Sequence, residues 1–157
     1  MHVGILVYSA TGHTLSIAAQ LKDGLSDVGH QVVLERLEAA DSVGASGASV
    51  VLKASPDVSC YDALVFACPV RGGMPAPPMD GYLTHLSSLS GKRAACLVTG
   101  FFPVAAWGRD QTLARMKAIS ESKGAKVCGC GSVGWFSVNR RAQAALVVDE
   151  LVRCFDQ

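Results

Sequence analysis

Short apolar runs alternate with segments of helical periodicity along this chain, and this alternation limits the fold more than any other feature. Five runs have the length of a β-strand, at residues 3–8, 31–37, 63–68, 94–98 and 126–133. Apolar residues recur at helical spacing over residues 14–28, 79–86, 110–123 and 141–155. Strands that alternate with helices are joined by right-handed crossovers into a parallel sheet with helices on both faces. We therefore expect a doubly wound α/β fold with a five-stranded parallel sheet.

The connection between the second and third strands departs from this pattern. Alanine, glycine and serine dominate residues 39–54, and the sequence predicts a long connection there with about one turn of helix. The chain has 157 residues, the length of one typical domain, so we expect residues 1–157 to form a single domain.

Composition excludes several classes of protein. The chain is 50% hydrophobic and 17% charged, which is unlike a disordered chain. Its formal net charge is +1, whereas nucleic-acid-binding domains are usually strongly basic, so we expect no nucleic-acid partner. No apolar run approaches the ~18 residues of a membrane-spanning helix, and the first residues lack the features of a signal peptide. These observations predict a cytoplasmic protein with no membrane partner.

The loop after the first strand carries the residues best suited to hold a ligand. It consists of Ser9, Ala10, Thr11, Gly12, His13 and Thr14, and it leads into a helix. A helix N-terminus offers backbone N–H groups and about half a positive charge, so hydroxyl donors there suit a phosphate without a cationic side chain. The alternative is that Ser9 or Thr11 only caps the helix, for which one hydroxyl is enough. We favour the phosphate site.

This loop resembles the flavodoxin phosphate loop, whose pattern is Ser/Thr-x-Thr-Gly-x-Thr. Residues 61–66 and 69–77 are similar to the third strand and second flavin loop of that family, and residues 91–93 lead similarly into the fourth strand. The resemblance covers residues 3 to about 155. It implies a flavodoxin-like domain that binds FMN, with strand order 2-1-3-4-5. It also implies that the second flavin loop supplies Pro69, Val70, Arg71, Gly72, Gly73 and Met74.

The two glycines of this second loop have a physical role beside the resemblance. Gly72 and Gly73 allow the backbone to approach a flat ring closely and to reorient a carbonyl without a Cβ penalty. By resemblance, a peptide of this loop contacts the flavin N5. The alternative is a simple turn that enters a helix.

The third candidate loop, residues 99–108, differs from that of electron-carrying flavodoxins. Those proteins usually present a tyrosine and several acids here, and this loop has neither. Its candidate flavin contacts are Thr99, Gly100, Phe101, Phe102, Trp107 and Gly108. The aromatic residues could stack on the ring, belong to the core, or join the subunits of a homo-oligomer. The sequence leaves these alternatives open.

Six cysteines occur in the chain, most of them inside apolar runs, where free cysteine behaves as a small hydrophobe. We expect buried thiols. Cys128 and Cys130 are predicted to share one face of the last strand, with a redox pair or a metal site as the lesser alternative. Residues 129–134 match the pattern Gly-x-Gly-x-x-Gly but lie at the last strand, so they do not indicate a dinucleotide site.

Two functions are compatible with the resemblance. The first is an FMN-dependent reductase that passes electrons from NAD(P)H or ferredoxin to a small quinone-like oxidant, similar to quinone reductases of the tryptophan-repressor-binding type. The alternative is a flavodoxin-type single-electron carrier with no small-molecule substrate. Four arginines follow strands and should lie exposed near the flavin: Arg71, Arg109, Arg140 and Arg141. They predict an anionic electron donor or acceptor, such as NADPH or an acidic ferredoxin.

Overall fold

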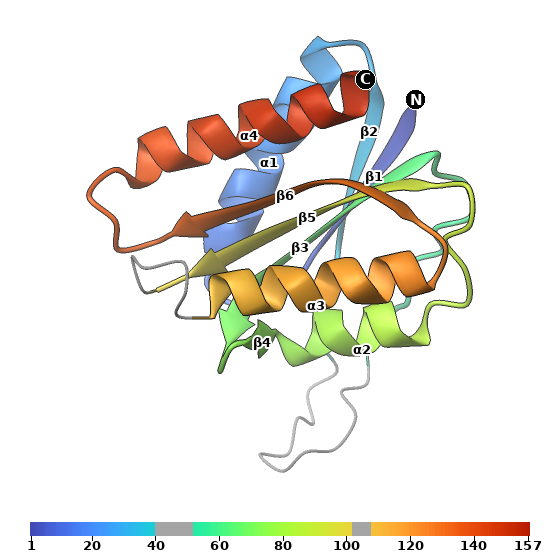
Figure 1. Ribbon diagram of the computed structural model, residues 1–157, viewed down its shortest axis with the longest axis horizontal. Helices are drawn as coiled ribbons and strands as arrows, with labels where there is room; N and C mark the ends of the chain where they lie inside the picture. The colour runs from blue at the N-terminus through green and yellow to red at the C-terminus, as the bar shows by residue number, and fades with distance from the viewer. Residues whose placement is uncertain (40–51, 102–107) are drawn as a thin grey trace.

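The structure is a computed structural model that describes residues 1–39, 52–101 and 108–157. Its strands are β1 (His2–Val7), β2 (Gln31–Arg36), β3 (Ala63–Arg71), β4 (Met74–Pro75), β5 (Arg93–Gly100) and β6 (Lys126–Gly134). Its helices are α1 (His13–Asp27), α2 (Pro77–His85), α3 (Arg109–Ser122) and α4 (Arg140–Asp156). Strands and helices alternate as predicted, and Figure 1 shows their arrangement.

The five long strands form one parallel sheet in the order β2-β1-β3-β5-β6. Counted among themselves, the parallel strands follow the predicted order 2-1-3-4-5. The sequence did not predict β4, which pairs antiparallel with the end of β3 through Val70–Pro75 and Arg71–Met74. Because of this hairpin, β3 extends to Arg71, three residues beyond its predicted end.

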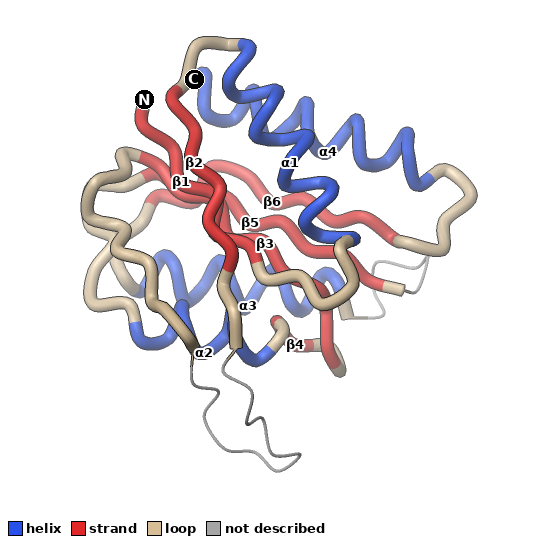
Figure 2. Tube along the Cα trace, turned by 180° about the vertical axis from the view of Figure 1, so that it is seen from behind, coloured by secondary structure: helices blue, strands red, loops and turns tan. Residues whose placement is uncertain are grey.

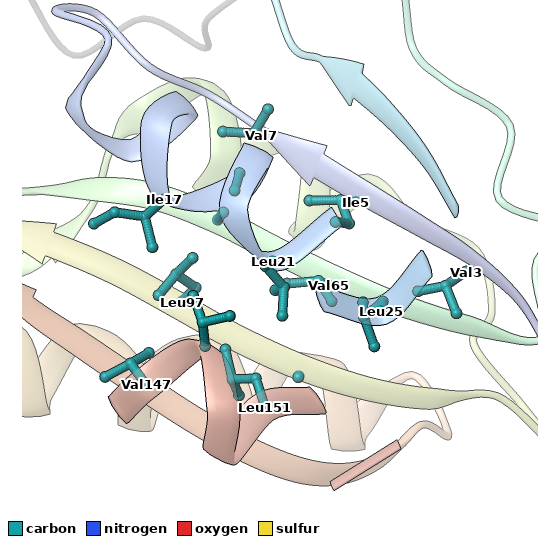
Figure 3. Packing of buried hydrophobic residues seen from close by; sticks show 14 of the residues in the cluster. Val3, Ile5, Val7, Ile17, Leu21, Leu25, Val65, Leu97, Val147 and Leu151 are labelled. Carbon is teal, nitrogen blue, oxygen red and sulfur yellow. The ribbon is translucent and has the colours of Figure 1, made fainter. Parts of the chain in front are cut away.

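Helices cover both faces of the sheet, with α1 and α4 on one side and α2 and α3 on the other (Figures 1 and 2). On the first side, Ile17, Leu21 and Leu25 of α1 share a buried cluster with Val147 and Leu151 of α4, over the central strands (Figure 3). The cluster on the other side contains Phe66, Met79, Leu83, Leu89 and Met116. Strands buried from both sides must be apolar at every position, which explains the continuous apolar runs of β1, β3 and β5.

The connection after β2 is only partly described. Ala39 forms an isolated antiparallel bridge with Leu52, and residues 53–62 contain no helix. The helical turn was predicted within residues 39–54, and residues 40–51 of that range lie outside the described residues.

The cysteines are less uniformly buried than predicted. Cys68 and Cys96 are fully buried, Cys128 and Cys154 are half-buried, and Cys60 and Cys130 are exposed. The prediction therefore holds for two of the thiols, because the remaining cysteines occupy a loop, the edge strand β6 and the last turn of α4.

Cys128 and Cys130 do not share a face of β6, contrary to the prediction. Cys128 packs against the cluster beneath α1 and α4, whereas Cys130 pairs in register with Cys96 of β5, whose side chain belongs to the opposite cluster. The reason is a β-bulge. The pairing of β6 with β5 steps from Val127 to Gly129 and skips Cys128, and one inserted residue changes the side to which the following side chains point.

Candidate functional site

The segments that follow β1, β3, β5 and β6 meet at the carboxyl edge of the sheet. They line a small cavity of about 40 Å³, which adjoins a wider one of about 570 Å³. The lining residues of the small cavity are Ser9, Ala10, Thr11, His13, Thr14, Pro69, Val70, Arg71, Thr99, Gly100, Phe101 and Trp135. All of these except Trp135 were predicted as site residues, so the fold brings the three predicted loops together.

The remaining predicted residues are placed differently. Gly72 and Gly73 line an adjoining cavity with Val70, Arg71, Gly100, Phe101 and Arg109. Gly12 and Gly108 are the N-cap residues of α1 and α3 and line neither cavity. Met74 is exposed in β4 and also lines neither. Phe102 and Trp107 lie outside the described residues.

The N-terminus of α1 opens onto the first cavity. Gly12 is its N-cap residue with φ of +89°, and no side chain of the described residues caps the first turn. Ser9 Oγ instead accepts a hydrogen bond from the Gly12 N–H at 3.0 Å. The helical ladder begins with the Ser16 N–H on the Gly12 carbonyl, so the N–H groups of residues 13–15 have no partner within the helix. No side chain of the loop therefore caps these N–H groups.

Two threonines from different segments of the chain line this cavity. The hydroxyls of Thr14 and Thr99 are 2.8 Å apart, and both side chains are buried. Thr14 belongs to the first turn of α1 and Thr99 to the end of β5. Their hydrogen bond ties the first predicted loop to the third.

The second loop is a tight hairpin between β3 and β4. Gly72 and Gly73 are its two central residues, with φ of +57° and +75°. Positive φ at both central positions matches the right-handed twist of the flanking strands and strongly favours glycine. The sequence analysis offered a flavin-contacting loop or a simple turn into a helix and did not predict this hairpin, whose geometry explains the glycine pair.

Trp135 lines the candidate site, and the sequence analysis missed it. Its ring stacks on His13 at 3.8 Å between centroids and 12° between planes, and the Arg140 guanidinium lies 4.6 Å from its centroid. The signal was present, because Trp135 directly follows β6 and therefore lies at the carboxyl edge. Beside it, Phe136 stacks on Phe101 at 5.5 Å, and both rings are largely exposed.

The predicted exposed rim of four arginines is wrong at one position. Arg71 and Arg141 are exposed and Arg140 is half-buried, but Arg109 is only 3% exposed. Arg109 donates a hydrogen bond to Ser132 Oγ at 3.2 Å, and burial lowers the pKa of its guanidinium. Its stem packs over Gly100, where a Cβ would lie 2.9 Å from Arg109 Cγ. The side chain of Arg109 is therefore covered where the start of α3 packs against the end of β5.

Within the described ranges, no group of three or more His, Cys, Asp or Glu side chains could hold a metal ion. In the same ranges, none of the helices is long and apolar enough to cross a membrane.

Comparison with known proteins identifies the fold. No family model and no curated protein matches this chain. A flavodoxin from Streptococcus pneumoniae TIGR4 matches with a TM-score of 0.70 at 19% identity, covering 98% of this chain and 99% of that one. A WrbA-like flavodoxin from Agrobacterium tumefaciens matches with a TM-score of 0.68 at 14% identity, covering 97% of each chain. A flavoprotein from Lactobacillus acidophilus NCFM, solved in complex with FMN, matches with a TM-score of 0.65 at 18% identity, covering 83% of this chain and 92% of that one. The chain has the flavodoxin-like fold.

Proposed function

We propose that this protein binds one FMN non-covalently at the carboxyl edge of the sheet and acts as a redox protein. The observation that carries this proposal is the N-terminus of α1, which no described side chain caps and which opens onto a cavity shared with Val70 and Phe101. A molecule with a phosphate at one end and a flat ring at the other would place the phosphate at the helix N-terminus and the ring in the cavity. The Lactobacillus acidophilus flavoprotein, which has the same fold, was solved with FMN.

The phosphate end is held by the backbone and by hydroxyls. The N–H groups of residues 13–15 and the exposed hydroxyl of Thr11 donate to phosphate oxygens, with the helix dipole supplying the positive charge. Each hydrogen bond to a charged group contributes roughly 1.5–3 kcal/mol. The buried bond between Thr14 and Thr99 holds the first turn of the helix in place.

The ring end is held by the second and third loops. When bound, FMN supplies a group that takes up and releases one or two electrons. Val70 and Phe101 offer apolar surface to the ring, and stacking on an aromatic side chain adds ~0.5–1.5 kcal/mol beyond burial. The Gly72–Gly73 peptide lies in the adjoining cavity, where the glycines allow it to reorient toward the ring edge. Trp135, stacked on His13, closes the cavity on the side of β6.

The function that this site supports best is reduction of a small quinone-like oxidant, with NAD(P)H or reduced ferredoxin as the electron donor. Support comes from the adjoining cavity, which opens beside the hairpin and is lined by Arg71 and Arg109. A flat, anionic molecule would find space there, and positive charge from the exposed Arg71, next to the position of the ring.

A single-electron carrier is the second candidate. Phe101 is 54% exposed and Phe136 is 70% exposed, and their stacked rings form an apolar patch at the site, a feature of protein docking surfaces. Against this candidate, flavodoxin-type carriers are typically acidic, whereas the net charge here is +1.

The proposed electron donor or acceptor is anionic. Arg71 and Arg141 are exposed near the site, and Arg140 lies over Trp135. Local positive charge steers an anionic partner even when net charge is near zero.

All six cysteines are free, which fits the reducing environment of the cytoplasm.

Titration of the apo-protein with FMN, followed by flavin fluorescence, tests the cofactor. We expect Thr11→Ala to weaken FMN binding about tenfold or more, since it removes one donor to the phosphate. Ser26→Ala, at the far end of α1, changes another exposed hydroxyl and should leave the affinity unchanged. Equal affinity of the Thr11 variant and the wild type would contradict the phosphate assignment.

A second measurement separates the two redox functions. The FMN-loaded protein is mixed with NADPH or NADH and a quinone, and turnover is followed by absorbance. Multiple turnovers support the reductase. If no turnover occurs with NADPH, NADH or reduced ferredoxin as donor, and the protein exchanges electrons rapidly with another redox protein, the carrier is favoured.

A further inference from the structure

Two cysteines meet at the opposite end of β6 from the cavity. Cys128 lies near the start of β6 and Cys154 in the last turns of α4, and their Sγ atoms are 2.9 Å apart. Both side chains are half-buried, so reagents in solution can reach them. A disulfide bond measures ~2.05 Å, and forming one here requires the sulfurs to approach by about 1 Å.

The backbone has two features that bring these thiols together. The β-bulge at Cys128 turns its side chain toward α4, whereas strict alternation would have placed it on the same side as Cys130. Gly129 and Gly131 allow α4 to pack closely on β6: a Cβ at Gly129 would lie 2.9 Å from Cys154 Sγ, and one at Gly131 would lie 2.3 Å from Val147 Cγ1.

Two cationic side chains lie beside the pair. An open depression beside the thiols is lined by Arg93, Lys126, Cys128, Cys154 and Gln157. Arg93 is held in place because its guanidinium donates to the carbonyl oxygens of Cys154, Phe155 and Gln157.

This environment favours Cys128 as the reactive thiol. The hydrogen bond with Cys154 lowers the pKa of Cys128 to about 7, and the Arg93 guanidinium adds to the lowering. The same hydrogen bond raises the pKa of Cys154. In its thiol form, Cys128 can also donate to the Ala94 carbonyl at 3.4 Å, so both protonation states have a partner.

We propose that Cys128 and Cys154 form a redox-modification site that reacts with an anionic low-molecular-weight disulfide and becomes an intramolecular disulfide. The Cys128 thiolate attacks one sulfur of the small disulfide, and the S–S bond of that molecule breaks to release one thiolate. The Cys154 thiol then loses its proton and attacks the Cys128 sulfur of the mixed disulfide, releasing the second small thiolate. The two protein thiols lose two electrons, and the small disulfide gains them.

The positive lining selects the charge of the reagent. Arg93 and Lys126 attract a disulfide that carries carboxylates, such as oxidised glutathione, and repel one that carries ammonium groups, such as cystamine.

Cys96 and Cys130 form the rival pair on the other face of the sheet. Cys130 is exposed, and its hydrogen bond with Cys96 lowers the pKa of Cys130 to about 7. Cys96, however, is 0% exposed, whereas Cys154 of the first pair is half-buried. Cys96 is therefore poorly placed to resolve a mixed disulfide.

The test uses the reduced full-length chain incubated with oxidised glutathione. Remaining thiols are alkylated, and the protein is analysed by intact mass and by tryptic peptides. We expect the loss of two hydrogen atoms and a cross-link between peptides 127–140 and 154–157. Because Cys128 and Cys130 share a tryptic peptide, Cys130→Ser serves as the matched control and should give the same cross-link. Cys154→Ser should stop at a stable glutathione adduct on Cys128.

The charge of the site supplies a second test. If the two thiols were merely close, their reaction rate would not depend on the charge at residue 126. We expect Lys126→Glu to slow the reaction with oxidised glutathione by about tenfold at low salt and to accelerate the reaction with cystamine. Lys22→Glu, the same charge change on α1, should alter neither rate. The proposal is overturned if Cys128 and Cys154 are both fully alkylated after incubation, if the cross-link joins Cys130, or if Lys126→Glu and Lys22→Glu behave alike.

Discussion

The Thr14 hydroxyl lies 2.8 Å from the Thr99 hydroxyl, and this buried hydrogen bond joins the first turn of α1 to the end of β5. The proposed phosphate loop and the proposed third flavin loop are therefore coupled at the candidate cofactor site. Neither hydroxyl is reachable by solvent, so loss of one leaves the other buried with one partner fewer.

The first prediction is a double-mutant cycle on this pair. Thr14→Val or Thr99→Val alone should lower the free energy of unfolding by about 1–3 kcal/mol, because one hydroxyl loses its partner. The double variant should cost less than the sum, since apolar groups of similar shape replace both partners. Urea denaturation measures all four proteins, and strict additivity would show that the two hydroxyls act independently.

The second prediction concerns the hairpin glycines. Gly72→Ala should destabilise the protein by about 1–2 kcal/mol, because φ is +57° and the surrounding space is open, so that the strain comes from the backbone alone. Gly81→Ala in α2 also has open space but no positive φ, and should stabilise by ~0.5–1 kcal/mol. Thermal unfolding of both variants compares them directly. Equal effects would contradict the hairpin geometry.

The third prediction is that stability depends on FMN. Ligand at 1,000 times its dissociation constant adds about 4 kcal/mol by mass action, because it binds only the folded state. The melting temperature of apo-protein should therefore rise with FMN concentration. Riboflavin, which lacks the phosphate, is the matched control and should give a much smaller rise. A melting temperature that FMN does not change would contradict the proposed function.

The fourth prediction concerns the charges around the site. Arg71→Glu with Arg141→Glu should slow reduction by NADPH about tenfold at low salt. The effect should shrink with added salt, since exposed charges are screened beyond ~10 Å at 0.1 M. Lys22→Glu with Arg153→Glu makes the same change of net charge on α1 and α4 and should have little effect. Arg109 is unsuitable for this test because it is buried. Identical rates for both double variants would remove any steering role.

The fifth prediction concerns alkaline pH. Burial raises the pKa of Cys68 from 9.0 to about 12. The folded state therefore keeps the proton that the unfolded chain loses, so stability from this group is complete below about pH 9 and falls as pH rises toward 12. Between these limits, the wild type should lose about 1.4 kcal/mol per pH unit more than Cys68→Ala. Parallel pH profiles of the two unfolding free energies would show that Cys68 ionises equally in both states.

The fold was largely predictable, and so was the position of the candidate loops at the carboxyl edge of the sheet. The apolar runs, together with the phosphate-loop resemblance, led to the five parallel strands in the observed order. The loops at residues 9–14 and 69–73 lie at the carboxyl edge, as expected of parallel strands that end on one side. What was missed depends on contacts between distant segments: Trp135 reaches His13, and Arg109 is covered by packing against Gly100.

The sequence by itself determined which segments become strands and helices, because the repeats of apolar residues are local and each element must bury one or two faces. It also placed the hydroxyl-rich loop at a helix N-terminus, where backbone groups alone can attract an anion. Only the tertiary structure decided where individual side chains point. One residue inserted at Cys128 shifts its strand against β5, and the close packing of α4 on Gly129 then brings Cys154 to it. The register of a strand and the distance between a helix and the sheet result from packing between segments far apart in the chain. No local pattern of residues encodes them.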